Sequence, residues 1–299
     1  MGKLGVSLVL PVLLCAHMLA EDMPVVTEAM VRNINSRSQW KASLDWVGDM
    51  TIAQARHRLL SSLPAYVSSL PTADIDQSSV APSSFDSRDE WQGCVGPIRD
   101  QGKCGSCWAF AATTVLADRF CIQQAVHVIL SPQWLVSCDT TDSGCGGGNM
   151  ADVWGYMSQM GVPADACDPY TSGLTNQNGQ CDASCPLFYT AQTVSQLPGP
   201  SAMQAALQQG GPIHTHFQVY QDFMSYSSGV YTYTTGNMLG WHAVRVVGWG
   251  YQQGANFWIV ANSWGQRWGM DGFFWIAFGQ CQFDVGAIAG NAGTIYKPE

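Results

Sequence analysis

The chain has 299 residues, of which 46% are apolar, and its 13 basic and 22 acidic residues give a formal net charge of −9. This length is enough for one large core or for two lobes. The sequence contains no run rich in Lys or Arg, so nothing in its charge pattern indicates nucleic-acid binding.

The N-terminus has the pattern of a secretory signal peptide. Lys3 precedes an apolar run that ends at Ala20, directly before Glu21 and Asp22. The run contains Pro11 and is short for a membrane span. We therefore predict a signal peptide over residues 1–20 rather than a buried N-terminal helix, and a product that is not held in a membrane once this peptide is removed.

Residues 21–79 differ from the rest of the chain and are predicted to form a pro-segment. They contain no cysteine, and a helical-looking stretch runs from Val25 to about Leu60. A stretch rich in Ser and Pro follows over 61–84 and reads as a linker that a protease can cut. The mature domain should then span residues 80–299. The alternative is a small N-terminal domain that stays attached.

Eleven cysteines are present, and Cys15 leaves with the signal peptide. Most of the other ten should pair in an oxidising compartment. Because ten is an even number, counting alone does not leave a free thiol.

The second part of the chain predicts an α+β class. Cys107 to Ile122 reads as a helix that is buried nearly all round, because no charged residue occurs from Cys107 to Ala117. Strand-like segments follow at 213–220, 230–233, 242–248, 257–262 and 272–278. A helical lobe followed by a β lobe favours a functional site between the two.

The stretch QGKCGSCWAF, residues 101–110, has three interpretations at this point: a redox pair, half of a metal site, or a nucleophile beside a structural cysteine. Cys107 would lie in the first turn of its helix, where the helix dipole favours a thiolate, so we expect a depressed pKa. A thiolate nucleophile needs a base and a residue that orients the base. His242 begins one Val-rich strand and Asn262 ends another, so the two side chains could meet at one rim.

Together, QGKCGSCWAF, WHAVRVVGWG and NSWGQRWGMDGFFWI resemble the papain-like cysteine peptidases over about residues 81–299. The resemblance implies a two-lobed fold, with a helical lobe and a β-barrel-like lobe on either side of the active-site cleft. It implies that Cys107 is the nucleophile, His242 the base, and Asn262 the residue that orients the imidazole. Gln101 would donate to the oxyanion, and Trp264 would shield the His–Asn bond.

The same resemblance disfavours the other two interpretations. It makes Cys104 a structural cysteine tied to Cys145, and a thioredoxin-like site would not need His242 and Asn262. A zinc site could recruit His214 and His216, but no second CxxC completes four ligands. No metal and no cofactor is expected. A catalytically dead relative should lack the nucleophile or the base, and neither is substituted.

Within this family the chain is most similar to cathepsin B, in its short pro-segment and in the spacing of its cysteines. That resemblance implies four disulfides and leaves Cys281 as a buried thiol; the pairs are Cys94–Cys121, Cys104–Cys145, Cys138–Cys181 and Cys167–Cys185. One departure is clear. Only ten residues, none of them His, lie between Tyr170 and Cys181, where cathepsin B carries an occluding loop with two histidines. Without that loop we expect endopeptidase activity.

The resemblance also indicates which residues bind substrate. The walls of the main selectivity pocket would be Asn149, Met150, His216, Trp241, Ala243 and the neighbourhood of Gly286, with Gly147, Gly148 and Trp264 nearby. In cathepsin B an acidic residue near the position of Gly286 accepts arginine, whereas the nearest acid here, Asp284, lies two residues earlier, so we expect an apolar pocket. His216 either gives this pocket a titrating edge or is a strand histidine with no ligand role.

The resemblance implies a monomeric enzyme that acts on protein and peptide substrates and is inhibited by cystatin-like proteins. We expect it in the secretory pathway, in a lysosome-like vacuole or outside the cell.

Overall fold

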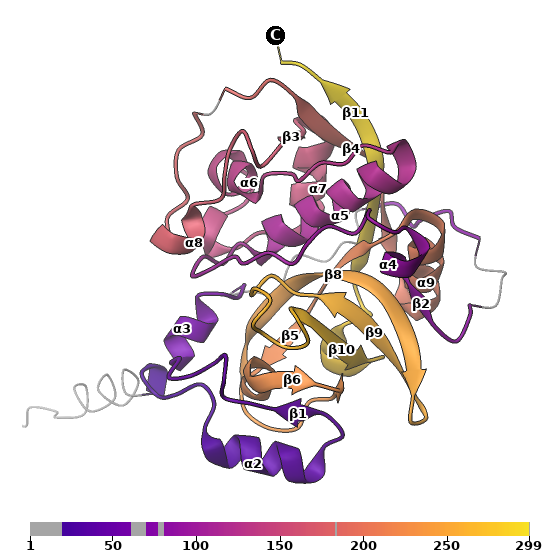
Figure 1. Ribbon diagram of the computed structural model, residues 1–299. Coiled ribbons are helices and arrows are strands. Elements are labelled where there is room, and N and C mark those ends of the chain that lie inside the picture. Colours follow the sequence, from indigo (N-terminus) through magenta and orange to yellow (C-terminus); the bar gives the residue numbers. More distant parts are fainter. Residues whose placement is uncertain (1–19, 61–69, 77–80, 183, 299) are drawn as a thin grey trace, which may run out of the picture.

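The computed structural model describes residues 20–60, 70–76, 81–182 and 184–298. The predicted signal peptide therefore lies outside the described residues, apart from Ala20. Two lobes are stacked in Figure 1. The upper lobe contains four helices: α5 (Cys107–Gln124), α6 (Pro132–Cys138), α7 (Met150–Gln159) and α8 (Ser172–Thr175). The lower lobe is built mainly from strands, so the α+β class is correct.

One sheet runs through both lobes. Its strand order is β3-β4-β11-β5-β8-β9-β10-β7, and β2 pairs with β8. The bounds are β2 Phe85–Asp86, β3 Val162–Pro163, β4 Phe188–Leu197, β5 Ile213–Tyr220, β7 Val230–Tyr231, β8 Met238–Gln252, β9 Ala255–Ala261, β10 Phe273–Ala277 and β11 Ala287–Tyr296. Two further helices lie at the side of this sheet, α4 (Ser87–Glu90) and α9 (Gly199–Gly210). The β5–β8–β9 part forms the centre of the lower lobe.

Helix α5 forms the core of the upper lobe. It begins at Cys107, as predicted, and ends two residues later than expected, where Ala125 takes a left-handed conformation. Nearly all of its first fifteen residues are buried, including Trp108 and Phe120. The charged pair that follows the apolar stretch is also buried. Asp118 accepts from Arg245 of β8 at 2.8 Å, so an ion pair joins the two lobes.

The N-terminal segment is not one helix, contrary to the prediction for Val25 to Leu60. It contains α2 (Glu28–Arg37), the short strand β1 (Lys41–Ala42) and α3 (Ile52–Arg56). Thr27 caps α2, and a capping box of Thr51 and Gln54 begins α3. The chain leaves the helical conformation between them because β1 pairs with β6 (Tyr226–Ser228) and Trp40 packs against Tyr226 and Tyr231. Tertiary pairing therefore overrides the apolar periodicity.

The disulfides all lie between residues 94 and 185. They join Cys94 to Cys121, Cys104 to Cys145, Cys138 to Cys181 and Cys167 to Cys185. Among the described residues Cys107 and Cys281 are the free cysteines. Cys281 is half-buried rather than buried as expected, because it lies in a short turn at a positive φ of 52° at the edge of the core.

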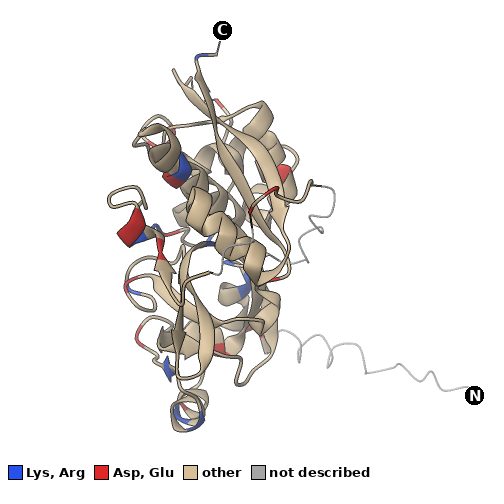
Figure 2. Cartoon of the chain, turned by 90° about the vertical axis from the view of Figure 1, so that its right-hand side faces the viewer, with Lys and Arg blue, Asp and Glu red and all other residues tan. Residues whose placement is uncertain are grey.

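Charged residues are sparse in this fold. Figure 2 shows them as small separate blue and red segments on a mostly tan chain. None of the described helices is both long enough and apolar enough to cross a membrane.

Candidate active site

The thiol of Cys107 lies at the junction of the lobes. Cys107 is the first residue of α5, which packs against β8 of the other lobe. Its side chain is fully buried and lies beside the backbone of Ala243, the residue that follows His242. The start of the buried helix therefore presents this thiol to the strand that carries the imidazole.

His242 and Asn262 form a hydrogen-bonded pair. They reach one another because β8 and β9 are antiparallel neighbours and Asn262 follows the last residue of β9. His242 Nε2 donates to Asn262 Oδ1 at 2.7 Å, and the backbone N–H of Ser263 donates to the same oxygen. The Trp264 ring lies 4.7 Å from the imidazole and covers the pair. Nε2 thus carries a proton, and in the neutral ring Nδ1 is the basic nitrogen.

Gln101 presents an amide group at the same site. Its Oε1 accepts from Ser263 Oγ at 2.7 Å, which fixes the orientation of the amide. Its Nε2 donates at 2.9 Å to the carbonyl of Cys104 and at 2.9 Å to the carbonyl of Arg58, from the N-terminal segment. A carbonyl oxygen therefore occupies a position in which Gln101 could stabilise negative charge.

Tyr170 and the segment that follows it hold the loop that contains Gln101 in place through hydrogen bonds. Tyr170 Oη donates to the carbonyl of Gln101 at 2.9 Å and accepts from Ser106 Oγ at 2.7 Å. The N–H of Lys103 donates to the carbonyl of Gly173. These contacts fix the residues on both sides of Cys104.

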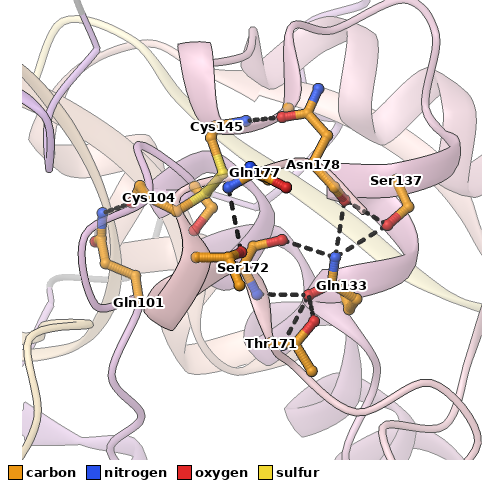
Figure 3. The surroundings of a disulfide bond; sticks show 12 residues. Gln101, Cys104, Gln133, Ser137, Cys145, Thr171, Ser172, Gln177 and Asn178 are labelled. Atoms are coloured by element: carbon orange, nitrogen blue, oxygen red, sulfur yellow. Dashed lines mark hydrogen bonds between the residues drawn. A yellow bond between two sulfur atoms is a disulfide. The ribbon is translucent and has the colours of Figure 1, made fainter. Parts of the chain in front are cut away.

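Gln133 of α6 holds that bracing segment in place, as Figure 3 shows. Its Oε1 accepts from the N–H groups of Thr171 and Ser172, and its Nε2 donates to Ser172 Oγ and the carbonyl of Asn178. Asn178 Oδ1 in turn accepts from the N–H of Cys145 at 2.8 Å, next to the Cys104–Cys145 bridge. The ten residues before Cys181 are thus a compact support beside the site.

Residues 57–60 of the N-terminal segment cover the site and are called the covering segment below. Leu60 pairs with Trp241 through two backbone hydrogen bonds of 2.8 and 3.0 Å. A Cβ on Gly105 would lie 3.3 Å from the carbonyl oxygen of Leu59, so the segment passes close to the loop before Cys107. The preceding part also contributes, because Trp46 stacks on Trp264 with ring centroids 5.4 Å apart.

Burial explains why the thiol does not have the depressed pKa that its helix position suggested. Burial raises the pKa of Cys107 to about 12, although backbone hydrogen bonds oppose this shift. Burial also lowers the pKa of His242 to about 4, against the effect of Asn262. Desolvation penalises both charged forms, so the covered site holds a neutral thiol and a neutral imidazole.

The side chain of Leu60 is buried where the sequence analysis placed the selectivity pocket, and this place is called the Leu60 pocket below. Leu60 is 3% exposed and belongs to the same large apolar cluster as Met150, Trp241 and Ala243, three of the residues assigned to the pocket from the sequence. Gly147 also lies there, since a Cβ on it would be 3.2 Å from Leu60 Cδ2.

His216 adjoins this pocket. It pairs with Ala243 across β5 and β8, and its ring centroid lies 5.4 Å from that of Trp241. Burial lowers its pKa to about 4, so it is neutral at pH 5 and above. The neighbouring His214 accepts from Trp154 Nε1 and is part of the core.

The other assigned pocket residues have different surroundings. Gly148 faces Trp108, with no room for a Cβ. The side chain of Asn149 caps α7. Gly286 is buried just before β11, the strand that pairs with β5. Asp284, the acid nearest to Gly286, accepts from Trp258 Nε1 at 2.7 Å and therefore points into the core.

Sequence reasoning did not identify Ser263, Tyr170, Gln133 or Trp46 as parts of this site. Only Ser263 had a local signal, since it lies within the NSWG motif. The others act through contacts with residues far away in the chain, which periodicity and composition do not reveal.

The redox and zinc interpretations do not fit these contacts. Cys104 is bonded to Cys145, so it does not pair with Cys107. In the described ranges no group of three His, Cys, Asp or Glu side chains could hold a metal ion.

A free thiol at a helix start, an imidazole held by an amide, and a fixed amide donor define the class of cysteine peptidases. The family model of the papain family cysteine proteases matches residues 81–290. The chain is 37% identical over 288 residues to cathepsin B-like CP2 of Giardia intestinalis, covering 91% of this chain and 96% of that one. It is 44% identical to cathepsin B-like CP3 of the same organism over 65% of this chain and 68% of the relative.

A solved structure gives the same result for the fold. A procathepsin B from Trypanosoma congolense superposes with a TM-score of 0.84 at 32% identity, covering 91% of this chain and all of the other. The chain belongs to the papain family and is a cathepsin B-like cysteine protease with the papain-like α+β fold. Its substrates are proteins, and its disulfides are consistent with the secretory pathway.

Proposed function

We propose that this protease hydrolyses peptide bonds with Cys107 as nucleophile, His242 as general base and acid, and Asn262 as the residue that orients the imidazole. The observation that carries the proposal is the meeting of three groups from separate elements: the thiol at the start of α5, the His242–Asn262 pair and the Gln101 amide.

In the proposed reaction the Cys107 proton moves to His242 Nδ1 and the sulfur attacks the substrate carbonyl carbon. Gln101 Nε2–H and the backbone N–H of Cys107 stabilise the oxyanion, as the Gln101 amide now binds the Arg58 carbonyl. His242 then gives its proton to the leaving amine, and a thioester remains. Water activated by His242 hydrolyses the thioester and restores the thiol. No cofactor takes part.

The test is to label the processed protein with an epoxide-type active-site probe and to map the labelled cysteine. We expect the label on Cys107 and not on Cys281, and no peptidase activity in Cys107→Ala. Activity in that variant, or a label on Cys281 alone, would overturn the assignment.

We further propose that residues 21 to about 79 are an inhibitory pro-segment. The support is the position of the covering segment. Its Arg58 carbonyl accepts from Gln101, its Leu60 backbone pairs with Trp241, and its Leu60 side chain is buried in the apolar cluster. N-terminal sequencing of active enzyme should begin between about Asp74 and Ser84. Full activity of an intact chain that begins at Glu21 would refute this role.

An endopeptidase preference follows from the segment before Cys181. It is short, contains no histidine and is held by Gln133 and Asn178 beside the Cys104–Cys145 bridge. It thus contains no histidine and no cationic side chain that could pair with the carboxylate of a substrate. A peptide with a free C-terminus and its amidated form should be cut at similar rates; release of dipeptides from the free acid alone would contradict this.

The pocket occupied by Leu60 predicts selectivity for the substrate residue two before the cut. Its aliphatic occupant, with Asp284 turned into the core, supports a preference for Leu, Val or Phe over Arg of about 1–3 kcal/mol. Burial lowers the pKa of His216 to about 4 in the covered site, and protonation of His216 in the open site should add to the rejection of Arg as the pH falls. Equal cleavage of otherwise identical Val and Arg substrates would show that the pocket is built differently.

The remaining expectations stay proposals: a monomeric enzyme, sensitivity to cystatin-like inhibitors, and a final location in a lysosome-like vacuole or outside the cell.

A further inference from the structure

Residues 70–76, called the docked segment below, bind the main domain at a place separate from the covering segment. Gln196 of β4 makes most of the contacts. Its N–H donates to the carbonyl of Pro71 at 2.9 Å, and its carbonyl accepts from the N–H of Ala73 at 3.0 Å. Its side-chain Nε2 also donates to the carbonyl of Leu70 at 2.9 Å. The docked segment thus adds a short parallel strand to β4 at Thr72.

A second contact holds the far end of the docked segment. Gln209, near the end of α9, donates its side-chain N–H to the carbonyl of Asp76 at 3.0 Å. In Figure 1, α9 lies on the right of the molecule, whereas α3, which leads into the covering segment, lies on the left. The docked segment is therefore an attachment separate from the covering segment and from β1, which pairs with β6.

At Gln196 one edge of β4 is open, so another strand can pair with it. β4 pairs with β11 on one side along its length, and with β3 on the other side only at Phe188 and Tyr189. Among the described residues, only the docked segment bonds the open side at Gln196. Unpaired N–H and C=O groups on such an edge bind an extended peptide by main-chain hydrogen bonds.

The docked segment lies on the surface of the domain. Ala73 and Ile75 are half-buried against the main cluster, whereas Asp74 is exposed. These three residues line one side of an open pocket of about 440 Å³, and the domain side of this pocket includes Arg119, Gln123, Gln209 and Asn291.

We propose that the Gln196 edge of β4, together with the end of α9, is a second docking site of the protease. It binds an extended polypeptide by strand addition, and its occupant in the zymogen is the chain's own docked segment. Because both ends of the pro-segment are then attached, a covering segment that leaves the site is returned at a high effective concentration. This consequence rests on the inhibitory role proposed above, whereas the docking site rests on its own contacts.

The substitution Ala73→Pro tests the docking site in the full-length chain. It removes the N–H that donates to Gln196 and changes nothing in the main domain. The matched control is Asp74→Pro, because the N–H of Asp74 has no hydrogen bond among the described residues. Both are placed in a Cys107→Ala background, which prevents self-processing.

The first measurement is amide hydrogen exchange at Gln196, whose N–H is bonded to Pro71. Exchange should be at least tenfold slower in the full-length chain than in the processed enzyme. Ala73→Pro should abolish most of this protection and Asp74→Pro should keep it. Equal exchange in the full-length and processed proteins would overturn the docking site.

The second measurement uses chains that keep Cys107 and follows its alkylation before any cleavage. Loss of one hydrogen bond of the docked segment should raise the alkylation rate about 5–10-fold. If Ala73→Pro loses the protection at Gln196 but leaves the alkylation rate unchanged, the docked segment does not help to keep the covering segment on the site. If the unsubstituted zymogen is alkylated as fast as processed enzyme, the inhibitory role has failed, and the exchange result still decides the docking site.

Discussion

Replacing Leu60 by alanine tests the covering role in one step. The side chain is 3% exposed in the apolar cluster that also contains Met150, Trp241 and Ala243, while the two backbone bonds to Trp241 do not depend on it. Truncation removes three buried carbons at about 0.8 kcal/mol each. With the cavity that remains, the covered state should lose roughly 2–4 kcal/mol. The open population should therefore rise by roughly 30- to 1,000-fold.

The assay is the rate at which iodoacetamide alkylates Cys107 in intact zymogen at pH 7, with mass mapping to exclude Cys281 and any cleaved chain. When opening and closing are fast, this rate follows the open population. Arg32→Ala, on the exposed face of α2, is the control. A folded Leu60→Ala zymogen that is alkylated at the unsubstituted rate would show that the pocket contact does not hold the segment.

Three further predictions concern pH, catalysis and stability. Burial lowers the pKa of His242 and His216 to about 4 in the covered site, so the open state binds protons more readily. The rate of epoxide labelling of the zymogen, divided by the rate for the processed enzyme, should therefore rise as the pH falls from about 6.5 to 4, and a ratio that does not change with pH would contradict this. Gln101→Ala should lower kcat of the processed enzyme by about 10²–10³ with little change in KM; an unchanged kcat would remove Gln101 from the oxyanion site. Arg245→Met should cost roughly 3–5 kcal/mol in urea unfolding because Asp118 stays buried without its cation; adding Asp118→Leu should restore most of it, and no recovery would place the loss elsewhere.

The sequence predicted best those elements whose pattern is local. Residues Ile213–Tyr220 form β5 with the expected bounds, and α5 begins at Cys107 as the uncharged run indicated. Cys107 begins α5 and Asn262 directly follows β9, so the motifs around these two residues mark the ends of regular elements. His242 lies inside β8, which begins at Met238 and not at His242 as expected, because pairing with β5 extends the strand.

Long-range pairing accounts for what the sequence did not predict. The ten-residue strands β4 and β11 were not expected, since β11 reads AIAGNAGTIY, with few strand-forming residues. They form because they pair with one another across about a hundred residues. Likewise, the raised pKa of Cys107 depends on its complete burial in the assembled fold, which no local pattern around Cys107 indicates.

The positions of the disulfides give the two lobes different sensitivities to redox conditions. All four bridges lie between residues 94 and 185, and they close loops with sequence separations of 18 to 43 residues. Each such closure restricts the unfolded chain by about 3–4 kcal/mol. Reduction should therefore loosen the lobe that carries Cys107, while the strands that carry His242 and Asn262 contain no disulfide in the described residues. In a reducing environment the two parts of the proposed catalytic site would thus lose their support to different extents.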